Sequence, residues 1–93
     1  MPTYSQETQD GMAWIQAAFW RVSHRMNKPY QWCNWRGFTY YVLLEGEEQR
    51  RHVDFTQSQI DACASDGYTQ ERWQAEDALE RMLQLAEPGG IEL

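Results

Sequence analysis

The spacing of the apolar side chains changes at Pro29, and this change constrains the fold more than any other feature of the chain. Before Pro29 they recur every three or four residues between positions 5 and 26, which is the period of an amphipathic helix. The residues of this stripe, which we expect in the core, are Met12, Ile15, Phe19, Val22 and Met26. After Pro29 large side chains alternate with a period of two over residues 38–44 and 51–55, which predicts two strands. Because proline ends a helix, the chain should begin with a helix and continue into a sheet.

The residues between and before these strands predict an antiparallel meander. Residues 45–49 form a polar, glycine-containing connection of hairpin length, so the two strands should pair antiparallel. A shorter strand over residues 30–35, turned by Arg36 and Gly37, is expected before them. A sheet of two or three strands is not stable alone, so helices must cover one face while the other stays partly wet.

Two helices are expected after the strands. Thr56 and Gln59 match a capping box, which predicts a short helix that stops at Gly67. Thr69 should cap a last, longer helix that ends before residues 88–90. Its apolar residues, which fall within one arc, are Ala75, Ala78, Leu79, Met82, Leu83, Leu85 and Ala86.

These elements predict a single α+β domain over residues 1–93. It consists of an N-terminal amphipathic helix, a small antiparallel sheet of two or three strands, and a short and a longer helix packed on one sheet face. A chain of 93 residues is long enough for one core and too short for two. Thr3 and Gln6 match a capping box at the start of the first helix. Residues 1–4 and 89–93 should be loose.

Neither a membrane segment nor an export signal is expected. No apolar run approaches the ~20 residues of a membrane-spanning helix, and the N-terminus lacks the basic and apolar regions of a signal peptide. We therefore expect a cytoplasmic protein with no membrane partner. In that reducing compartment Cys33 and Cys63 should remain buried, unreactive thiols.

Charge is divided unevenly along the chain. Residues 1–44 carry two acids against four bases, a net charge of +2, whereas residues 45–93 carry twelve acids against four bases, a net charge of −8. The total of −6 argues against direct contact with nucleic acid, since affinity for phosphate comes mainly from Lys and Arg. A protein partner with a basic surface fits this charge better.

The last helix carries the candidate partner-binding surface. At helical spacing Glu76, Asp77 and Glu80 lie on one side, away from the apolar arc, and Trp73 lies one to two turns before them. Carboxylates in a row can imitate backbone phosphates or meet Arg and Lys of a partner. A tryptophan among them supplies the large apolar contact typical of protein interfaces.

Glu47 and Glu48, in the predicted hairpin turn, would extend this surface if the turn and the helix share one side of the domain. The alternative for both regions is an acidic face that only keeps the protein in solution. Asp77 and Arg81, four residues apart on the helix, can also pair with each other and remove part of the charge.

Tryptophans in the first half allow two further interpretations. Trp14 lies nearly opposite the apolar stripe of the first helix and Trp20 on its flank, so a second copy of the chain would find aromatic surface there. Aromatic residues are also interleaved with bases between positions 20 and 36, as on surfaces that stack single-stranded nucleic acid. Four bases give such a surface little grip, so most of these rings should belong to the core or the sheet face.

No motif predicts catalysis, a cofactor or a metal site. Cys33 or Cys63 with His24 or His52 would supply residue types for a thiol nucleophile, but in no recognisable arrangement. The same residues lack the close ligand pairs of zinc sites. We therefore expect a protein that is not an enzyme.

The function expected from the sequence is that of a small acidic binding protein, an inhibitor that occludes a basic surface of a protein partner, such as a surface that binds nucleic acid. Small inhibitors made by phages and other mobile elements, including anti-CRISPR proteins and DNA mimics, share this size and charge. Two alternatives stay open. One is a structural or regulatory homodimer assembled through exposed tryptophans, and the other is an immunity protein against a basic toxin.

Overall fold

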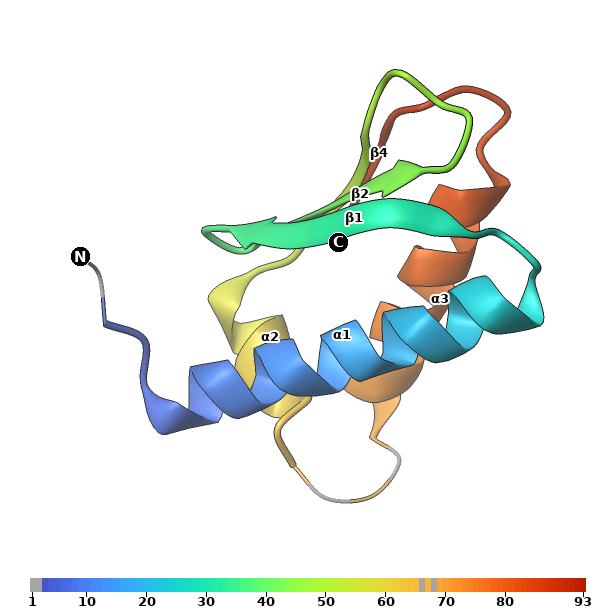
Figure 1. Ribbon diagram of the computed structural model, residues 1–93. Helices are drawn as coiled ribbons and strands as arrows, with labels where there is room; N and C mark the ends of the chain where they lie inside the picture. Colours follow the sequence, from blue (N-terminus) through green and yellow to red (C-terminus); the bar gives the residue numbers. More distant parts are fainter. Residues whose placement is uncertain (1–2, 66, 68) are drawn as a thin grey trace.

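The computed structural model describes residues 3–65, 67 and 69–93 and has the predicted α+β architecture. A layer of helices lies on one face of a single sheet, as Figure 1 shows. The elements in chain order are α1 (Gln6–Arg25), β1 (Tyr30–Arg36), β2 (Thr39–Leu44), β3 (Arg51–Asp54), α2 (Gln57–Ala62), α3 (Gln70–Gln84) and β4 (Gly90–Glu92). The predicted order of one helix, a strand meander and two helices is confirmed.

The sheet contains one strand more than predicted. Its order is β1-β2-β3-β4, and the first three strands form the predicted antiparallel meander. β4 pairs parallel to β3, so the prediction of a wholly antiparallel sheet followed by a loose C-terminal tail is wrong. The tail is held because Ile91 packs against the core and Leu93 N donates a hydrogen bond to Asp54 O at 3.1 Å.

α1 buries the predicted stripe beneath the sheet. Ile15, Phe19 and Val22 are fully buried, and Met12 and Met26 are partly buried against the same core. The phenyl ring of Phe19 meets Tyr30 of β1 and Tyr40 of β2 in edge contacts, with centroids 5.1 and 5.5 Å apart. α1 therefore lies under the β1 and β2 side of the sheet.

The cap of α1 differs from the prediction. Ser5 is the capping residue, because its hydroxyl oxygen accepts a hydrogen bond from Thr8 N at 3.1 Å. The capping box predicted at Thr3 and Gln6 is wrong, since Gln6 is already the first residue of the helix. The predicted caps of the later helices are confirmed. Thr56 and Gln59 form a complete capping box before α2, and Thr69 caps α3.

α1 and α2 approach closely at Gly11. A Cβ atom at this position would lie 1.9 Å from the carbonyl oxygen of Ile60, so only glycine fits the crossing. A hydrogen bond from Thr8 Oγ1 to Asp61 Oδ1 at 2.6 Å joins the same two helices one turn away. α2 is thereby held against α1, and α3 packs beside them under β3 and β4.

Among the described residues, no helix lies on the second face of the sheet. Alternation along the strands points Tyr40, Val42 and Val53 into the core, where all three are fully buried. Their neighbours Tyr41 and His52 point the other way, stay half-buried and pack against each other at a tilt, with ring centroids 5.4 Å apart. The predicted arrangement of one covered and one partly wet face is confirmed.

Candidate partner-binding surfaces

Trp73 is the most exposed large hydrophobic residue among the described residues. Its relative exposure is 65%, compared with 49% for Trp20 and 40% for Trp32. It lies in the first half of α3, on the side opposite the buried Ala75, Ala78 and Leu79. The sequence correctly placed this ring on the surface and not in the core.

The three carboxylates that follow Trp73 on α3 have partners within the chain. Arg25, from the last turn of α1, forms an ion pair with Glu76 at 3.6 Å and a shorter one with Glu80. Arg81 Nε donates to Asp77 Oδ2 at 2.9 Å, which is the pair expected from the sequence. The contribution of Arg25 was not predicted, because only the tertiary packing brings α1 beside α3.

These ion pairs remain open to solvent. The exposed fractions of the side chains are 54% for Arg25, 35% for Glu80, 50% for Arg81 and 63% for Asp77. Exposed pairs of this kind contribute only about 0–1 kcal/mol each, so an arginine from a partner can replace either internal arginine at little cost. The helix therefore offers an acidic surface of reduced net charge, not a bare row of carboxylates.

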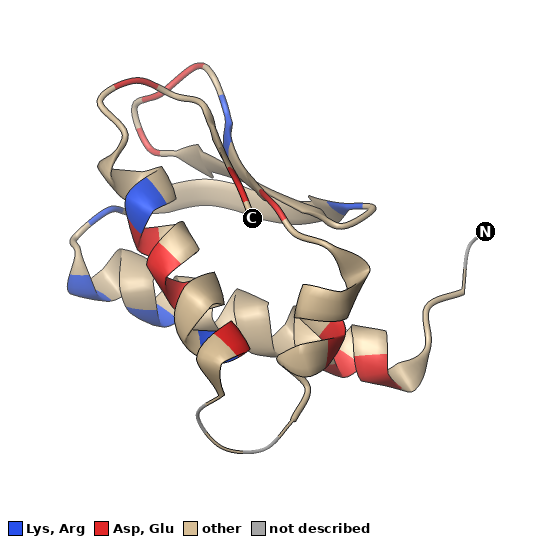
Figure 2. Cartoon of the chain, turned by 180° about the vertical axis from the view of Figure 1, so that it is seen from behind, with Lys and Arg blue, Asp and Glu red and all other residues tan. Residues whose placement is uncertain are grey.

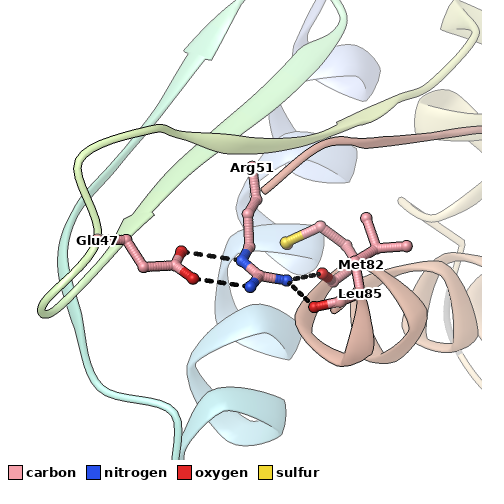
Figure 3. Close-up of polar contacts among 4 residues, drawn as sticks. All are labelled: Glu47, Arg51, Met82 and Leu85. Carbon is pink, nitrogen blue, oxygen red and sulfur yellow. Dashed lines mark hydrogen bonds and ion pairs between the residues drawn. The ribbon is translucent and has the colours of Figure 1, made fainter. Parts of the chain in front are cut away.

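The hairpin turn contributes differently from the prediction. Glu47 forms a two-point ion pair with Arg51, with Nε to Oε1 at 2.9 Å and Nη2 to Oε2 at 2.7 Å. Arg51 is only 4% exposed, and its Nη1 also donates to the carbonyl oxygens of Met82 and Leu85 at 2.9 and 2.8 Å (Figure 3). The carboxylate of Glu47 is therefore occupied by an internal ion pair. Through Arg51, the hairpin turn is linked to the C-terminal end of α3.

The electrostatics of this cluster follow from its contacts. Hydrogen bonds from Arg51 are the main reason that the pKa of Glu47 lies below its ordinary value. The pKa of Arg51 is raised, chiefly by the same hydrogen bonds. Both shifts keep the pair ionised at neutral pH.

Glu48 remains exposed at the hairpin. It lines a shallow hollow of about 320 Å³ on the uncovered sheet face, together with Trp32, Leu43, Gln49 and Arg50. Arg50 lies over the ring of Tyr41, with its guanidinium carbon 4.6 Å from the centroid. Figure 2 shows acidic positions along α3, in the turn between β2 and β3, and in the connection from α3 to β4. The hairpin turn and α3 therefore share one side of the molecule.

The two tryptophans of α1 lie in different environments. Trp14 is partly buried against the core, with Arg72 of α3 4.8 Å and Arg21 5.8 Å from its ring centroid. Trp20 is half exposed at the edge of a hollow of about 400 Å³ near the junction of α1 and β1. The remaining residues around this hollow are Ser23, His24, Asn27, Lys28, Pro29 and Tyr30. Of the two rings, only Trp20 offers a large exposed area for self-association.

The cysteine and histidine side chains do not assemble into one site. Cys63 is buried, and burial raises the pKa of its thiol to about 11, which keeps it protonated at neutral pH. Cys33 is partly buried against the core on β1, whereas His52 lies on the opposite face of the sheet, 4.0 Å from Asp54. Within the described part of the chain, no three His, Cys, Asp or Glu side chains are grouped so that they could hold a metal ion.

Comparison with protein-family models, curated proteins and solved structures found no match for this chain. Over the described residues, none of the helices has both the length and the apolar character needed to cross a membrane.

Proposed function

We propose that this protein is a non-enzymatic binding protein that uses the exposed side of α3 to cover a basic surface of a protein partner. The observation that supports this most strongly is the 65% exposure of Trp73 directly beside a group of carboxylates. Tryptophan is enriched among the residues that dominate the binding energy of protein interfaces, so an exposed indole with charged groups around it supports an interface at this place.

Binding would proceed by exchange of ion pairs. Arginine or lysine side chains of the partner would replace Arg25 at Glu80 and Arg81 at Asp77, while the partner covers Trp73. Each exchange keeps the number of ion pairs constant, so most of the net affinity would come from burial of the indole ring. The carboxylates would mainly orient the partner and speed its approach.

We propose the acidic inhibitors of phages and mobile elements, such as anti-CRISPR proteins and DNA mimics, as the functional class, acting in the cytoplasm. An inhibitor of this kind works by occlusion, since residues that cover a basic surface exclude its usual ligand. An immunity protein against a basic toxin would use the same physical mechanism, and the identity of the captured partner distinguishes the two.

Affinity capture from host lysate at low and high salt, followed by mass spectrometry, tests the proposal. The expected partner is a basic protein whose capture weakens as salt rises, because salt screens the attraction that speeds its approach, and whose capture is lost with Trp73→Ala. Trp20→Ala is the matched control, because it also removes an exposed indole from a helix but lies on a different side of the molecule.

Charge must be removed from α3 without disturbing Arg25. Reversal of Glu76 or Glu80 to lysine would place a cation beside Arg25 and weaken the packing of α1 on α3. Asp77→Asn avoids this problem and should weaken capture by about threefold to tenfold, with an unchanged circular dichroism spectrum. Undiminished capture by the Trp73→Ala, Asp77→Asn double variant would exclude this surface.

A further inference from the structure

β1 is an edge strand whose outer side is not paired within the described chain. The sheet order places β1 at one end, bonded to β2 only. The strand spans the seven residues Tyr30–Arg36 and has no charged side chain and no proline before Arg36. Monomeric proteins usually protect such an edge with charges, proline, a β-bulge or a covering element, because free main-chain groups recruit another strand. β1 has only a register irregularity between Tyr30 and Trp32, at its start, and, over the residues that the structure describes, the stretch from Trp32 to Trp35 carries no such protection.

Of the three exposed large hydrophobic residues in the described part of the chain, two flank this edge. Trp32 belongs to β1 itself and points to the uncovered sheet face, where it is 40% exposed. Trp20 comes from α1 in the layer below, where it shares a hollow with Pro29 and Tyr30 at the start of β1. Aromatic surface is therefore present both above and below the same row of unpaired main-chain groups.

Helix geometry confirms the position of Trp20. Arg25 faces α3, and α3 packs under β3 and β4 at the far end of the sheet. Trp20 is five residues from Arg25, about 140° around the helix axis, so it faces away from α3. In Figure 1 α1 runs below β1 along the near side of the molecule, with α3 behind it. Trp20 thus lies beneath the outer edge of β1.

This edge carries little net negative charge, because Glu48, which lines the hollow beside Trp32, is accompanied there by Arg50. No Asp or Glu occurs between residues 11 and 44, although the whole chain carries a net charge of −6. Lys28, at one end of the strand, lies close enough to Glu47 to help lower the pKa of that carboxyl, after the larger effect of Arg51. Arg36 lies at the other end of the strand.

We propose that β1 pairs antiparallel with β1 of a second copy across a two-fold axis, joining two four-stranded sheets into one sheet of eight strands. A second copy fits because two acidic molecules can approach through this neutral edge while their acidic helices point away from each other. The pairing gives hydrogen-bond partners to the free main-chain groups of both β1 strands. Trp20 and Trp32 of both copies then cover the junction between the two strands from below and above.

The two-fold axis has to pass near the middle of the strand. With the axis at Cys33 or Asn34, the two Arg36 side chains are about 13–20 Å apart and repel each other little. Asn34 then lies close to Asn34 of the partner subunit on the uncovered face. Trp32 lies opposite Asn34 or Arg36 of the partner subunit. Asn34 is exposed in the single chain, so it can be replaced without disturbing the core.

Sedimentation velocity over a range of concentrations tests this interface. We expect wild-type protein to change with concentration from the monomer of 11.1 kDa to a species of twice that mass. Asn34→Lys and Asn34→Asp should each weaken the dimer at least tenfold, because each sets two like charges beside the axis. A mixture of the two variants should recover dimers, since unlike charges then meet. Trp20→Ala should weaken the dimer by about tenfold or more.

Gln84→Lys is the matched control, because Gln84 is exposed on α3 and should leave the dimer unchanged. A wild-type protein that stays monomeric through the micromolar range would overturn the proposal. So would a dimer that both Asn34 variants leave intact, or one that is lost only with Trp73→Ala. The interface and the α3 surface lie on different sides, so the failure of one proposal is independent of the other.

Discussion

Arg51 shows how much a single buried side chain can decide in a small domain. Its guanidinium group donates to both oxygens of Glu47 and to two carbonyl groups at the end of α3. The last carbonyl groups of a helix have no hydrogen-bond donor inside the helix. A buried cation at this end supplies the donors that these carbonyl groups would otherwise lack. One residue thus connects the hairpin turn, β3 and α3.

Replacement of Arg51 should therefore be costly. Arg51→Met leaves the partly buried Glu47 carboxylate and the carbonyls of Met82 and Leu85 without their donor, and should lower the free energy of unfolding by about 3 kcal/mol. Urea unfolding monitored by tryptophan fluorescence measures the change. Arg50→Met, at the exposed neighbouring position, loses only the contact with the Tyr41 ring and should lower stability by no more than about 1 kcal/mol. Similar losses for both variants would argue against the role assigned to Arg51.

The contribution of Glu47 to stability should depend on pH. Its pKa in the folded protein lies below the ordinary value of 4.5 because Arg51 binds the carboxylate form. A lowered folded-state pKa stabilises the protein above the unfolded-state value, and this stabilisation disappears as the pH falls through the folded-state value. The difference in unfolding free energy between wild type and Glu47→Gln should thus be largest at neutral pH and shrink under acid conditions. If the difference in unfolding free energy were the same at neutral pH and at acid pH, this assignment would be contradicted.

At the scale of elements, the sequence predicted most helices and strands but not all of their contacts. The three- and four-residue spacing of α1 and the alternation of β2 and β3 mark elements whose two sides differ in burial. β4 was missed because three residues are too few to show a period, and its strand exists only because β3 offers a free edge. Gly11 gave no recognisable signal, since its role depends on where α2 crosses α1.

The crossing of α1 and α2 can be tested at this glycine. Alanine is the better helix former by about 1 kcal/mol, so Gly11→Ala would stabilise an isolated α1. In the folded protein the new methyl group would meet Ile60 O, so we expect a net destabilisation of about 1–3 kcal/mol instead. Thermal unfolding followed by circular dichroism shows whether Gly11→Ala lowers or raises the stability of the protein. Gln9→Ala, on the exposed side of α1, is the control and should be neutral or slightly stabilising.

At the scale of the whole molecule, the acidic helix α3 and the β1 edge are separate surfaces, and each has an exposed tryptophan beside it. The carboxylates of α3 and of the loops above it lie on one side, while the acid-free stretch of residues 11–44 supplies the β1 edge. Trp73 on α3, and Trp20 on the side of α1 that is turned away from α3, mark the two proposed surfaces, and both could be occupied at the same time.

The two proposals together predict a stoichiometry. If the dimer forms through β1, both α3 surfaces remain open, and the complex should contain two partner molecules per two copies of this chain. Light scattering of the purified complex gives its mass. With Asn34→Lys the complex should shrink to one partner and one copy without loss of partner affinity. A single partner molecule per wild-type dimer would show that one of the two surfaces is placed wrongly.

What the sequence alone determined is the set of local structures and the exposure of individual faces. Caps at Thr56 and Thr69, the core stripes and the surface position of Trp73 follow from residue types and their spacing, because these express local backbone preferences and burial. The tertiary structure decided which charges neutralise each other and which edge stays open. The pairs of Arg25 with Glu80 and of Arg51 with Glu47 depend on how elements pack, and electrostatic interactions depend on distance in space, not along the chain.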